Sequence, residues 1–276
     1  MRFSVLGSGS AGNCIVFGSC DCGYWLIDAG LSAKQITLRL ESRGIPLDAI
    51  KGIFITHEHK DHIGGLKVLL KKLEAPVYAS VLTQEYIASQ LDISADWVIF
   101  EPGQPFQVES LRVEAIRIPH DATDPVGYLI KDEYTSFAAM TDLGYASDSL
   151  AHKLRGYELL YLESNYDNKL LELDQKRPWS IKQRIASRHG HLSNEQASEL
   201  LQKLEPHGLQ KVALGHLSRD CNTAECIQTL FAQNHPTLDY QISQQLQPTC
   251  WLEILPPPPS PSVDSSKWEQ PTLFDL

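Results

Sequence analysis

Short hydrophobic runs alternate with glycine-rich and polar turns along the first part of the chain. The runs at 2–6, 13–17 and 23–28 are too short for helices and are bounded by turn residues, so they predict three β-strands. Ser32 is a suitable N-cap for a helix that ends at Ser42. Further along, the pattern predicts strands at 51–55 and 76–79 and helices at 63–73 and 82–90.

The middle of the chain is rich in strand patterns, and helices return in the second half. We expect strands at 106–108, 111–118, 126–131, 135–140, 157–162, 211–215 and 250–255, and helices at 147–154, 180–187, 194–204 and 221–233. Two sheets covered by helices on both outer sides would fit this order, so the predicted fold class is an α/β layered sandwich.

The character of the sequence changes after Leu255. Residues 256–266 are mainly prolines and serines, a composition that cannot build a packed core. We therefore predict one folded domain over residues 1–255 and a flexible tail over 256–276. The tail ends in an apolar peptide.

Composition excludes several classes of protein. The chain of 276 residues is 42% hydrophobic, which suffices for one large core or two smaller ones. Neither a signal peptide nor a membrane-length apolar run is visible, so we expect a soluble, cytoplasmic protein with no membrane partner. In such a protein the six cysteines are expected to be free thiols. Cys20 and Cys22 lack a second cysteine pair nearby, which favours a turn over a structural zinc site.

The net charge of −10 argues against a broad basic surface and against tight, nonspecific binding to nucleic acid. It does not exclude a nucleic-acid substrate. Bound divalent cations are strong local positive charges, and a carboxylate-rich metal site itself adds acidic residues.

The most informative stretch runs from His57 to His62 in the order His-x-His-x-Asp-His, directly after an apolar run. His57 and His59 are two residues apart, so in extended backbone they point to the same side. Asp61 and His62 are adjacent and can face a second ion as the chain turns into a helix. Imidazole and carboxylate groups are ligands that zinc and manganese prefer. The run therefore indicates ligands for two metals rather than a solvated, histidine-rich turn.

Three further candidate ligands each follow a predicted strand, the place where layered α/β folds usually build their sites: His120, Asp142 and His216. Each has an alternative role, as a loop histidine, a turn-capping aspartate or a packing histidine. We expect one ion to be held by His57, His59 and His120, and a second by Asp61, His62 and His216. Asp142 is then the carboxylate that bridges two cations, and a water deprotonated by both ions is the nucleophile.

Two residues are expected to support this site. Asp28 ends a strand and is placed to accept a hydrogen bond from a ligand imidazole. His191 precedes a predicted helix, where it can bind a phosphate oxygen or protonate a leaving group, unless it is a loop histidine without a role. We take Asp61 and His191 as the catalytic residues. The small glycine-serine loop at 7–13 can hold an anion at the rim, and we expect the remaining histidines, at 152, 189, 207 and 235, on the surface.

The chain resembles the metallo-β-lactamase superfamily. Its motifs follow the order found in that family: Asp28, the run at 57–62, Asp142 and His216. The segments that resemble its WalJ (YycJ) branch are 7–13, 119–122, 141–144, 162–167 and 190–194. The resemblance covers residues 1–255. It implies an αββα sandwich, a dinuclear zinc or manganese centre and 5′-to-3′ DNA exonuclease activity. The chain between Asp142 and His191 is too short for the inserted β-CASP domain of the RNase J kind.

The end of the tail resembles the short peptide with which bacterial DNA enzymes bind the replication sliding clamp. Gln270, Leu273 and Phe274 match its pattern, and Pro271 stands where an apolar residue is usual. Leu273 and Phe274 would fill an apolar pocket, while the tether raises the local concentration of the enzyme near DNA.

The lead hypothesis is a metal-dependent phosphodiesterase that acts on DNA ends in repair or replication. A small-molecule metallo-hydrolase of the same fold, specific for a thioester, lactam or cyclic nucleotide, is the alternative and would be active without polymeric DNA. A non-catalytic adaptor that keeps the metal fold for stability is the third reading, and absence of bound metal would favour it.

Overall fold

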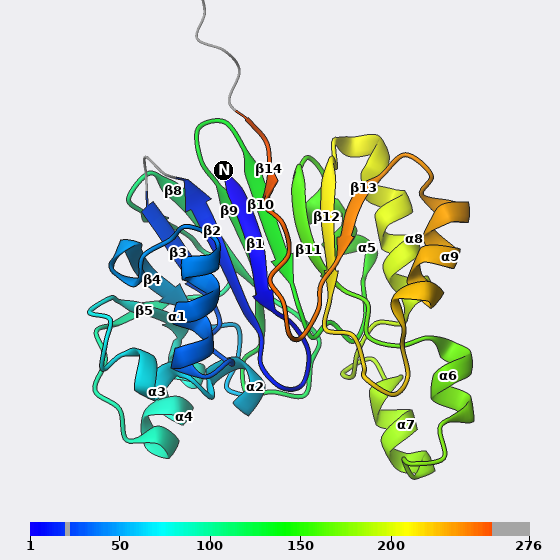
Figure 1. Cartoon of the computed structure of the whole chain (residues 1–276), viewed down its shortest axis with the longest axis horizontal. Helices are drawn as coiled ribbons and strands as arrows, with labels where there is room; N and C mark the ends of the chain where they lie inside the picture. Colours follow the sequence, from blue (N-terminus) through cyan, green and yellow to red (C-terminus); the bar gives the residue numbers. More distant parts are fainter. Residues whose placement is uncertain (20–22, 256–276) are drawn as a thin grey trace, which may run out of the picture.

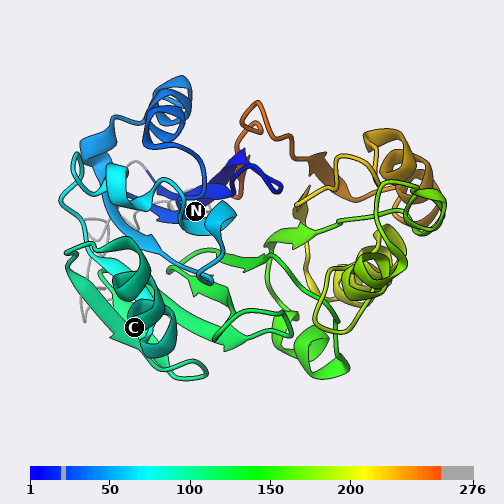
Figure 2. The same cartoon turned by 90° about the horizontal axis from the view of Figure 1, so that it is seen from below.

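The computed structural model describes residues 1–19 and 23–255. Cys20, Cys22 and the tail with Gln270, Leu273 and Phe274 lie outside the described residues. Two mixed sheets face each other between two sets of helices (Figures 1 and 2), which confirms the predicted αββα sandwich. Among the described residues, the helices are all too short or too polar to cross a bilayer.

The first sheet has the order β14-β1-β2-β3-β4-β5-β6. Its strands are β1 (Arg2–Gly7), β2 (Cys14–Ser19), β3 (Gly23–Ile27), β4 (Ile50–Phe54), β5 (Val77–Ser80), β6 (Trp97–Phe100) and β14 (Leu252–Glu253). Strands β3 to β6 run parallel, whereas β14, β1, β2 and β3 pair antiparallel.

The second sheet has the order β13-β12-β11-β10-β9-β8-β7. Its strands are β7 (Pro105–Val108), β8 (Leu111–Arg117), β9 (Val126–Lys131), β10 (Ser136–Met140), β11 (Leu159–Glu163), β12 (Lys211–Gly215) and β13 (Asp239–Ile242). Strands β10 to β13 run parallel, and β7 to β10 pair antiparallel.

Helices cover the outer face of each sheet. The first sheet is covered by α1 (Ala33–Ser42), α3 (Leu66–Leu69) and α4 (Val81–Leu91), and the second by α5 (Asp148–Leu154), α8 (Asn194–Leu204) and α9 (Ala224–Asn234). The remaining helical segments are η1 (Leu47–Ala49), η2 (Glu205–His207), α2 (Lys60–Ile63), α6 (Asn168–Leu173) and α7 (Trp179–Ile185). Figure 1 shows α2, α6 and α7 at the lower edge of the molecule.

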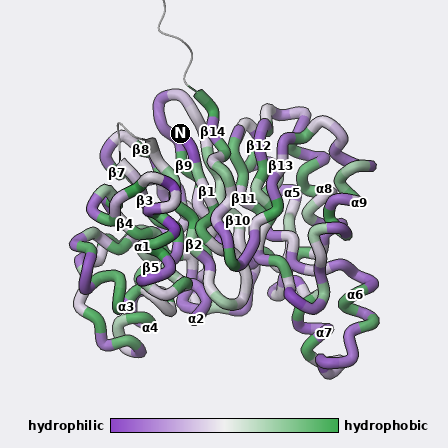
Figure 3. The backbone as a smooth tube through the Cα atoms, in the orientation of Figure 1, coloured by the Kyte–Doolittle hydropathy of each residue, from purple (hydrophilic) through white to green (hydrophobic). Residues whose placement is uncertain are grey.

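Because both faces of each sheet are covered, successive side chains of a strand are apolar on both sides. In β10, Phe137 and Ala139 face the core between the sheets, while Ala138 and Met140 pack against the helices. Figure 3 shows hydrophobic residues along the strands of both sheets and hydrophilic residues in many outer loops. This double burial explains why short continuous apolar runs could be recognised as strands.

Several predicted elements need correction. The helix expected at 63–73 is replaced by two short helices, α2 and α3, because the N–H of Gly65 donates to the carbonyl of Ala29 instead of continuing the helix from α2. The helix expected from residue 221 begins at Ala224, after the N-cap Thr223. The edge strands β6 and β13 and the short helix α6 were not predicted, and β14 is shorter than expected.

The strand directions gather functional residues at one edge. Parallel pairing places the carboxyl ends of β3 and β4 together, and does the same for β10, β11 and β12. Two antiparallel steps bring the end of β8 to the edge that the end of β10 occupies. Residues that follow these strands therefore converge, as open α/β sheets usually arrange their sites.

Candidate metal centre

His57, His59 and His120 form the first set of candidate ligands. One ring nitrogen of each lies within 4.8 Å of the others. His57 and His59 follow β4 in the first sheet, and His120 follows β8 in the second. Nε2 of His120 lies 3.3 Å from Nδ1 of His59, so the set joins the two sheets at their common edge.

Asp61, His62 and His216 form the second set, again with one ligand atom each within 4.8 Å of the others. Oδ2 of Asp61 lies 3.8 Å from Nε2 of His62 and 3.6 Å from Nε2 of His216. Both groups of three residues that the sequence predicts are among four overlapping groups whose potential ligand atoms lie this close together in the described residues. The other two groups are His57, His62 and Asp142, and Asp142, Glu163, His191 and His216.

Asp142 lies between these two sets. Its Oδ2 is 3.0 Å from Nε2 of His62, and its Oδ1 is 3.8 Å from Nε2 of His120. Nδ1 of His216 lies 2.9 Å from the same Oδ1 atom. The carboxylate therefore reaches members of both sets, as the position of a bridging ligand requires.

The side chain of His57 tests whether this cluster fits a cation. Its Nδ1 lies 3.0 Å from the hydroxyl of Thr56, whereas its buried Nε2 has no hydrogen-bond partner among the described residues. A buried polar atom without a partner costs free energy, and metal coordination would supply the missing interaction. Nitrogen and oxygen donors without sulfur suit a borderline or hard divalent ion. The residues present therefore fit a divalent metal.

The protonation of the cluster follows from its charges. Burial alone would lower the pKa of His62 and of His216, but Asp142 raises both, that of His62 to about 10. Burial opposes ionisation of Asp61, yet a hydrogen bond from His216 and the charge of His62 lower its pKa to about 2. For His57, burial and the charge of His62 lower the pKa well below its ordinary value.

Asp28 contacts the ring nitrogen of His62 that faces away from Asp61 and Asp142. Its Oδ2 lies 2.7 Å from Nδ1 of His62, and its Oδ1 accepts a hydrogen bond of 2.9 Å from the backbone N–H of Thr56. This is the contact between a carboxylate and a ligand imidazole that the sequence predicts. It leaves Nε2 of His62 directed toward Asp61 and Asp142.

Three of these residues have left-handed backbone conformations. Asp28, Asp142 and His216 have φ values of 62°, 49° and 55°, and each directly follows its strand or lies one residue beyond it. Such conformations are uncommon for residues other than glycine and tend to occur at functional sites. Here they turn the chain sharply at the edge where these side chains meet.

Glu163 is a member of this site that our sequence interpretation missed. It is fully buried, and its Oε1 lies 2.6 Å from Nδ1 of His191 and 3.1 Å from Nδ1 of His216. Its Oε2 accepts hydrogen bonds from the backbone N–H groups of Leu143 and Leu192. A carboxylate at the end of the apolar run 159–162 was the available signal.

His191 lies at the rim of the cluster. Its side chain is 22% exposed, and its Nδ1 is also 3.7 Å from Oδ1 of Asp142. The next residues lead into α8, whose N-cap is Ser193 with a capping box to Gln196. Burial would lower the pKa of His191, but the charge of Glu163 raises it.

The loop at 7–13, where the sequence suggests that an anion could bind, lies beside a candidate ligand. The N–H groups of Gly9, Ala11 and Gly12 donate to groups of the protein. Nδ2 of Asn13 lies 3.0 Å from Nε2 of His62.

The other histidines divide into two groups. His152, His189 and His207 are exposed, as predicted. His235 is buried, so its predicted surface position is wrong; it lies between α8 and α9, with Nε2 2.8 Å from Oγ of Ser198. The described cysteines, Cys14, Cys221, Cys226 and Cys250, are free thiols as expected.

Comparison with known proteins agrees with this geometry. Residues 24–216 match the family model described as a beta-lactamase superfamily domain. The chain is 36% identical to exodeoxyribonuclease YycJ of Bacillus anthracis over 228 residues, which cover 82% of this chain and 85% of that protein. It is 33% identical to exodeoxyribonuclease WalJ of Streptococcus pneumoniae over 247 residues, 88% of each chain.

The fold is also that of a solved structure. The metallo-β-lactamase-fold protein YhfI from Bacillus subtilis superposes with a TM-score of 0.69 at 17% identity, over 91% of this chain and 99% of that one. Since the family model, two relatives of similar length and the fold all agree, the chain belongs to the metallo-β-lactamase superfamily and is a metal-dependent hydrolase.

Proposed function

We propose that the chain is a two-metal phosphodiesterase that degrades DNA from its ends in the 5′-to-3′ direction. The observation that carries this proposal is the pair of ligand sets on either side of Asp142. The two relatives named exodeoxyribonucleases, at 33–36% identity over most of their length, support the same substrate class.

In this proposal, His57, His59 and His120 hold one zinc or manganese ion, and Asp61, His62 and His216 hold the other. Bound there, the ions would stabilise charge on phosphoryl oxygens and acidify a water molecule. Asp142 would bridge the two positions, and Asp28 would fix the ring of His62.

Two residues at the rim would act on the substrate. The carboxylate of Asp61, 24% exposed, is placed to accept a proton from an attacking water. Glu163 holds Nδ1 of His191, so the other ring nitrogen is available to bind the scissile phosphate or to protonate the leaving oxygen. Both roles require the substrate phosphate to enter between these side chains.

The decisive experiment combines metal analysis with nuclease assays on duplexes labelled at the 5′ or the 3′ end. We expect bound zinc or manganese in molar excess over protein, and short labelled products from the 5′ end. A purified, metal-loaded protein that hydrolyses small thioesters, lactams or cyclic nucleotides but leaves DNA intact would contradict the proposal.

Variants separate the roles within the site. Asp142→Ala is expected to abolish nuclease activity and to reduce bound metal, whereas His191→Ala is expected to keep the metal and lose rate. His207→Ala, at an exposed histidine, is the matched control. An active, metal-loaded Asp142→Ala protein would remove the bridging role, and a His191→Ala protein of unchanged rate would remove His191 from the reaction.

We also propose that Gln270, Leu273 and Phe274 bind the replication sliding clamp and so place the enzyme in DNA repair or replication. The support is the sequence pattern of the tail. A pull-down with purified clamp should retain the full chain and lose a variant that ends at Glu269. Equal retention of both proteins would contradict this partner.

A further inference from the structure

Residues 168–188, which hold α6 and α7, form a segment that we call the arm. Figure 1 shows it at the lower right, beyond the lower edge of the sheets. The arm leaves the sandwich shortly after Glu163 and returns just before His191, and these two residues are in contact at 2.6 Å. Both ends of the arm are therefore held at the metal centre.

Backbone hydrogen bonds join the two ends of the arm. The N–H of Asn165 donates to the carbonyl of Leu192, and the N–H of Asn194 donates to the carbonyl of Tyr166. The N–H of His191 donates to the carbonyl of Ile185, at the end of α7. The backbone of His191, which is proposed to meet the substrate phosphate, is thus bonded directly to the arm.

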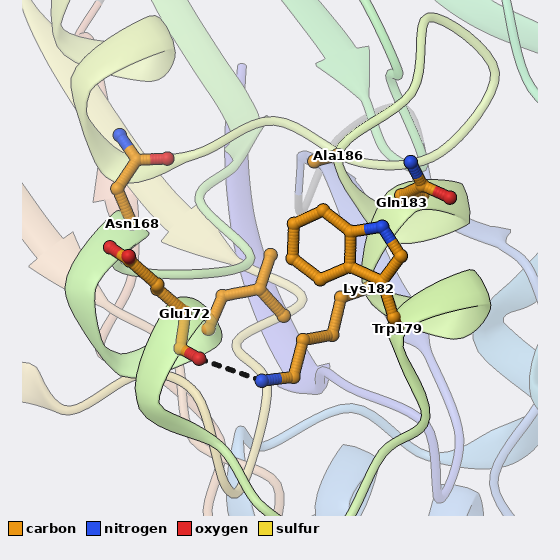
Figure 4. A pocket seen from close by; sticks show the side chains of 7 residues that line it. Asn168, Glu172, Trp179, Lys182, Gln183 and Ala186 are labelled. Atoms are coloured by element: carbon orange, nitrogen blue, oxygen red, sulfur yellow. Dashed lines mark hydrogen bonds between the residues drawn. The ribbon is translucent and has the colours of Figure 1, made fainter.

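The arm differs in charge from the rest of the protein. Residues 168–188 contain six lysines and arginines and two carboxylates, in a chain whose net charge is −10. Within the described residues, neither Lys182 nor Arg188 forms an ion pair with a carboxylate. Lys182 donates to the carbonyl of Glu172 (Figure 4), and Arg188 lies over the ring of Tyr145. Their charges are therefore available to an anionic ligand.

A hollow of about 250 Å³ lies between α6 and α7. Its lining includes Leu171, Trp179 and Lys182, and Figure 4 shows the indole of Trp179 facing across it. Trp179 is 67% exposed, which is unusual for the largest apolar side chain. The hollow is smaller than the roughly 300–1,000 Å³ of pockets that hold whole drug-sized ligands, so it suits a single ring system.

An exposed indole beside a lysine is the kind of surface on which an unpaired base stacks while a phosphate meets positive charge. A base within a duplex has both faces covered by its neighbours and cannot enter such a hollow. We propose that the arm holds a single-stranded stretch of the DNA substrate, with one base stacked on Trp179 and a neighbouring phosphate at Lys182. This inference rests on the proposed nuclease function and adds the strand form that the enzyme binds.

Binding can be measured apart from hydrolysis. The full chain, stripped of metal with a chelator, is titrated with a fluorescently labelled dT oligonucleotide and, separately, with a blunt duplex of equal length. We expect Trp179→Ala to weaken binding of the single strand by roughly 5- to 150-fold, the range for one base stack. Trp179→Phe keeps a ring for stacking, so it should bind within about threefold of the wild type while losing part of the tryptophan quenching caused by the oligonucleotide.

Two further variants test whether the phosphate is bound by Lys182 and whether the loss of DNA binding is specific to Trp179. Lys182→Gln should lower the slope of log affinity against log salt by about 0.7, the value for one phosphate contact on a single strand. Tyr134→Ala is the matched control, since Tyr134 is also an exposed aromatic residue (56%) but lies in the turn between β9 and β10, away from the ligand edge. It should bind both oligonucleotides as the wild type does.

The outcomes separate this inference from the proposed function. If Trp179→Ala binds the single strand as tightly as the wild type, or if quenching is unchanged in Trp179→Phe, the arm does not hold a base, whatever the nuclease assay shows. If the metal-loaded wild type leaves DNA intact although Trp179 is required for binding, the proposed nuclease function fails and the binding site stands.

Discussion

Oε1 of the fully buried Glu163 lies 2.6 Å from Nδ1 of His191, whose side chain is 22% exposed, at the base of the arm. The same oxygen is 3.1 Å from Nδ1 of His216, a candidate ligand. One carboxylate therefore contacts both the imidazole proposed to meet the substrate and an imidazole proposed to bind metal. Such outer partners fix the tautomer and the ring angle of the residues that they contact.

We predict that Glu163→Gln lowers nuclease activity by roughly 10- to 100-fold, the range for loss of an outer-shell partner. The amide keeps the size of the carboxylate, but it removes the charge. It can also place its own N–H against an imidazole N–H, and two donors cannot form a hydrogen bond. Metal content and kcat should be measured together. Glu114→Gln, which removes one partner of the surface ion pair with Lys153, is the control and should match the wild type. Wild-type activity in Glu163→Gln would show that these imidazoles do not need the charge.

Asp28→Asn should weaken metal binding. The carboxylate contacts Nδ1 of His62 and accepts from Thr56, and the amide can replace only part of this network. We expect a metal affinity lower by roughly 10- to 100-fold, measured by competition with a chelating dye. Asp239→Asn, at an exposed ion pair with Lys211, should leave the affinity unchanged. Equal affinities of the two variants would argue against support of His62 by Asp28.

The sequence predicted most of the candidate ligands because each polar residue follows an apolar strand. His57 to His62, His120, Asp142 and His216 all have this local signal. Glu163 belongs to the same class, but its partners His191 and His216 lie 28 and 53 residues away, and only the fold brings them together.

His235 shows the opposite failure. Nothing near it in sequence indicates burial, because Asn234 precedes it and a proline follows. It is the C-cap of α9, and it is buried because α8, more distant in sequence, packs against α9. The edge strands β6 and β13 were also missed, although the run Trp97–Phe100 is a strong local signal for a strand.

His235→Ala is expected to lower the free energy of unfolding by about 2–4 kcal/mol without a change in specific activity. The ring bonds to Ser198 on one side, contacts Glu205 on the other and packs on Phe231. Urea denaturation followed by circular dichroism measures the effect. His207→Ala, at an exposed histidine, should change the free energy by less than about 0.5 kcal/mol. If both variants were equally stable, the buried network would contribute nothing.

Gly30→Ala is expected to disturb the ligand run directly. A Cβ atom at Gly30 would lie 1.6 Å from the carbonyl oxygen of Asp61 and 2.7 Å from the backbone nitrogen of Asn13, so one of these backbones must move. We expect a loss of about 3 kcal/mol or more in unfolding free energy, together with a loss of bound metal. Gly208→Ala is the matched control, because its φ of +97° strains alanine while no atom lies within 4 Å of the added carbon. It should cost about 1 kcal/mol and retain the metal. Full metal content in Gly30→Ala would mean that the loop after β3 does not set the position of Asp61.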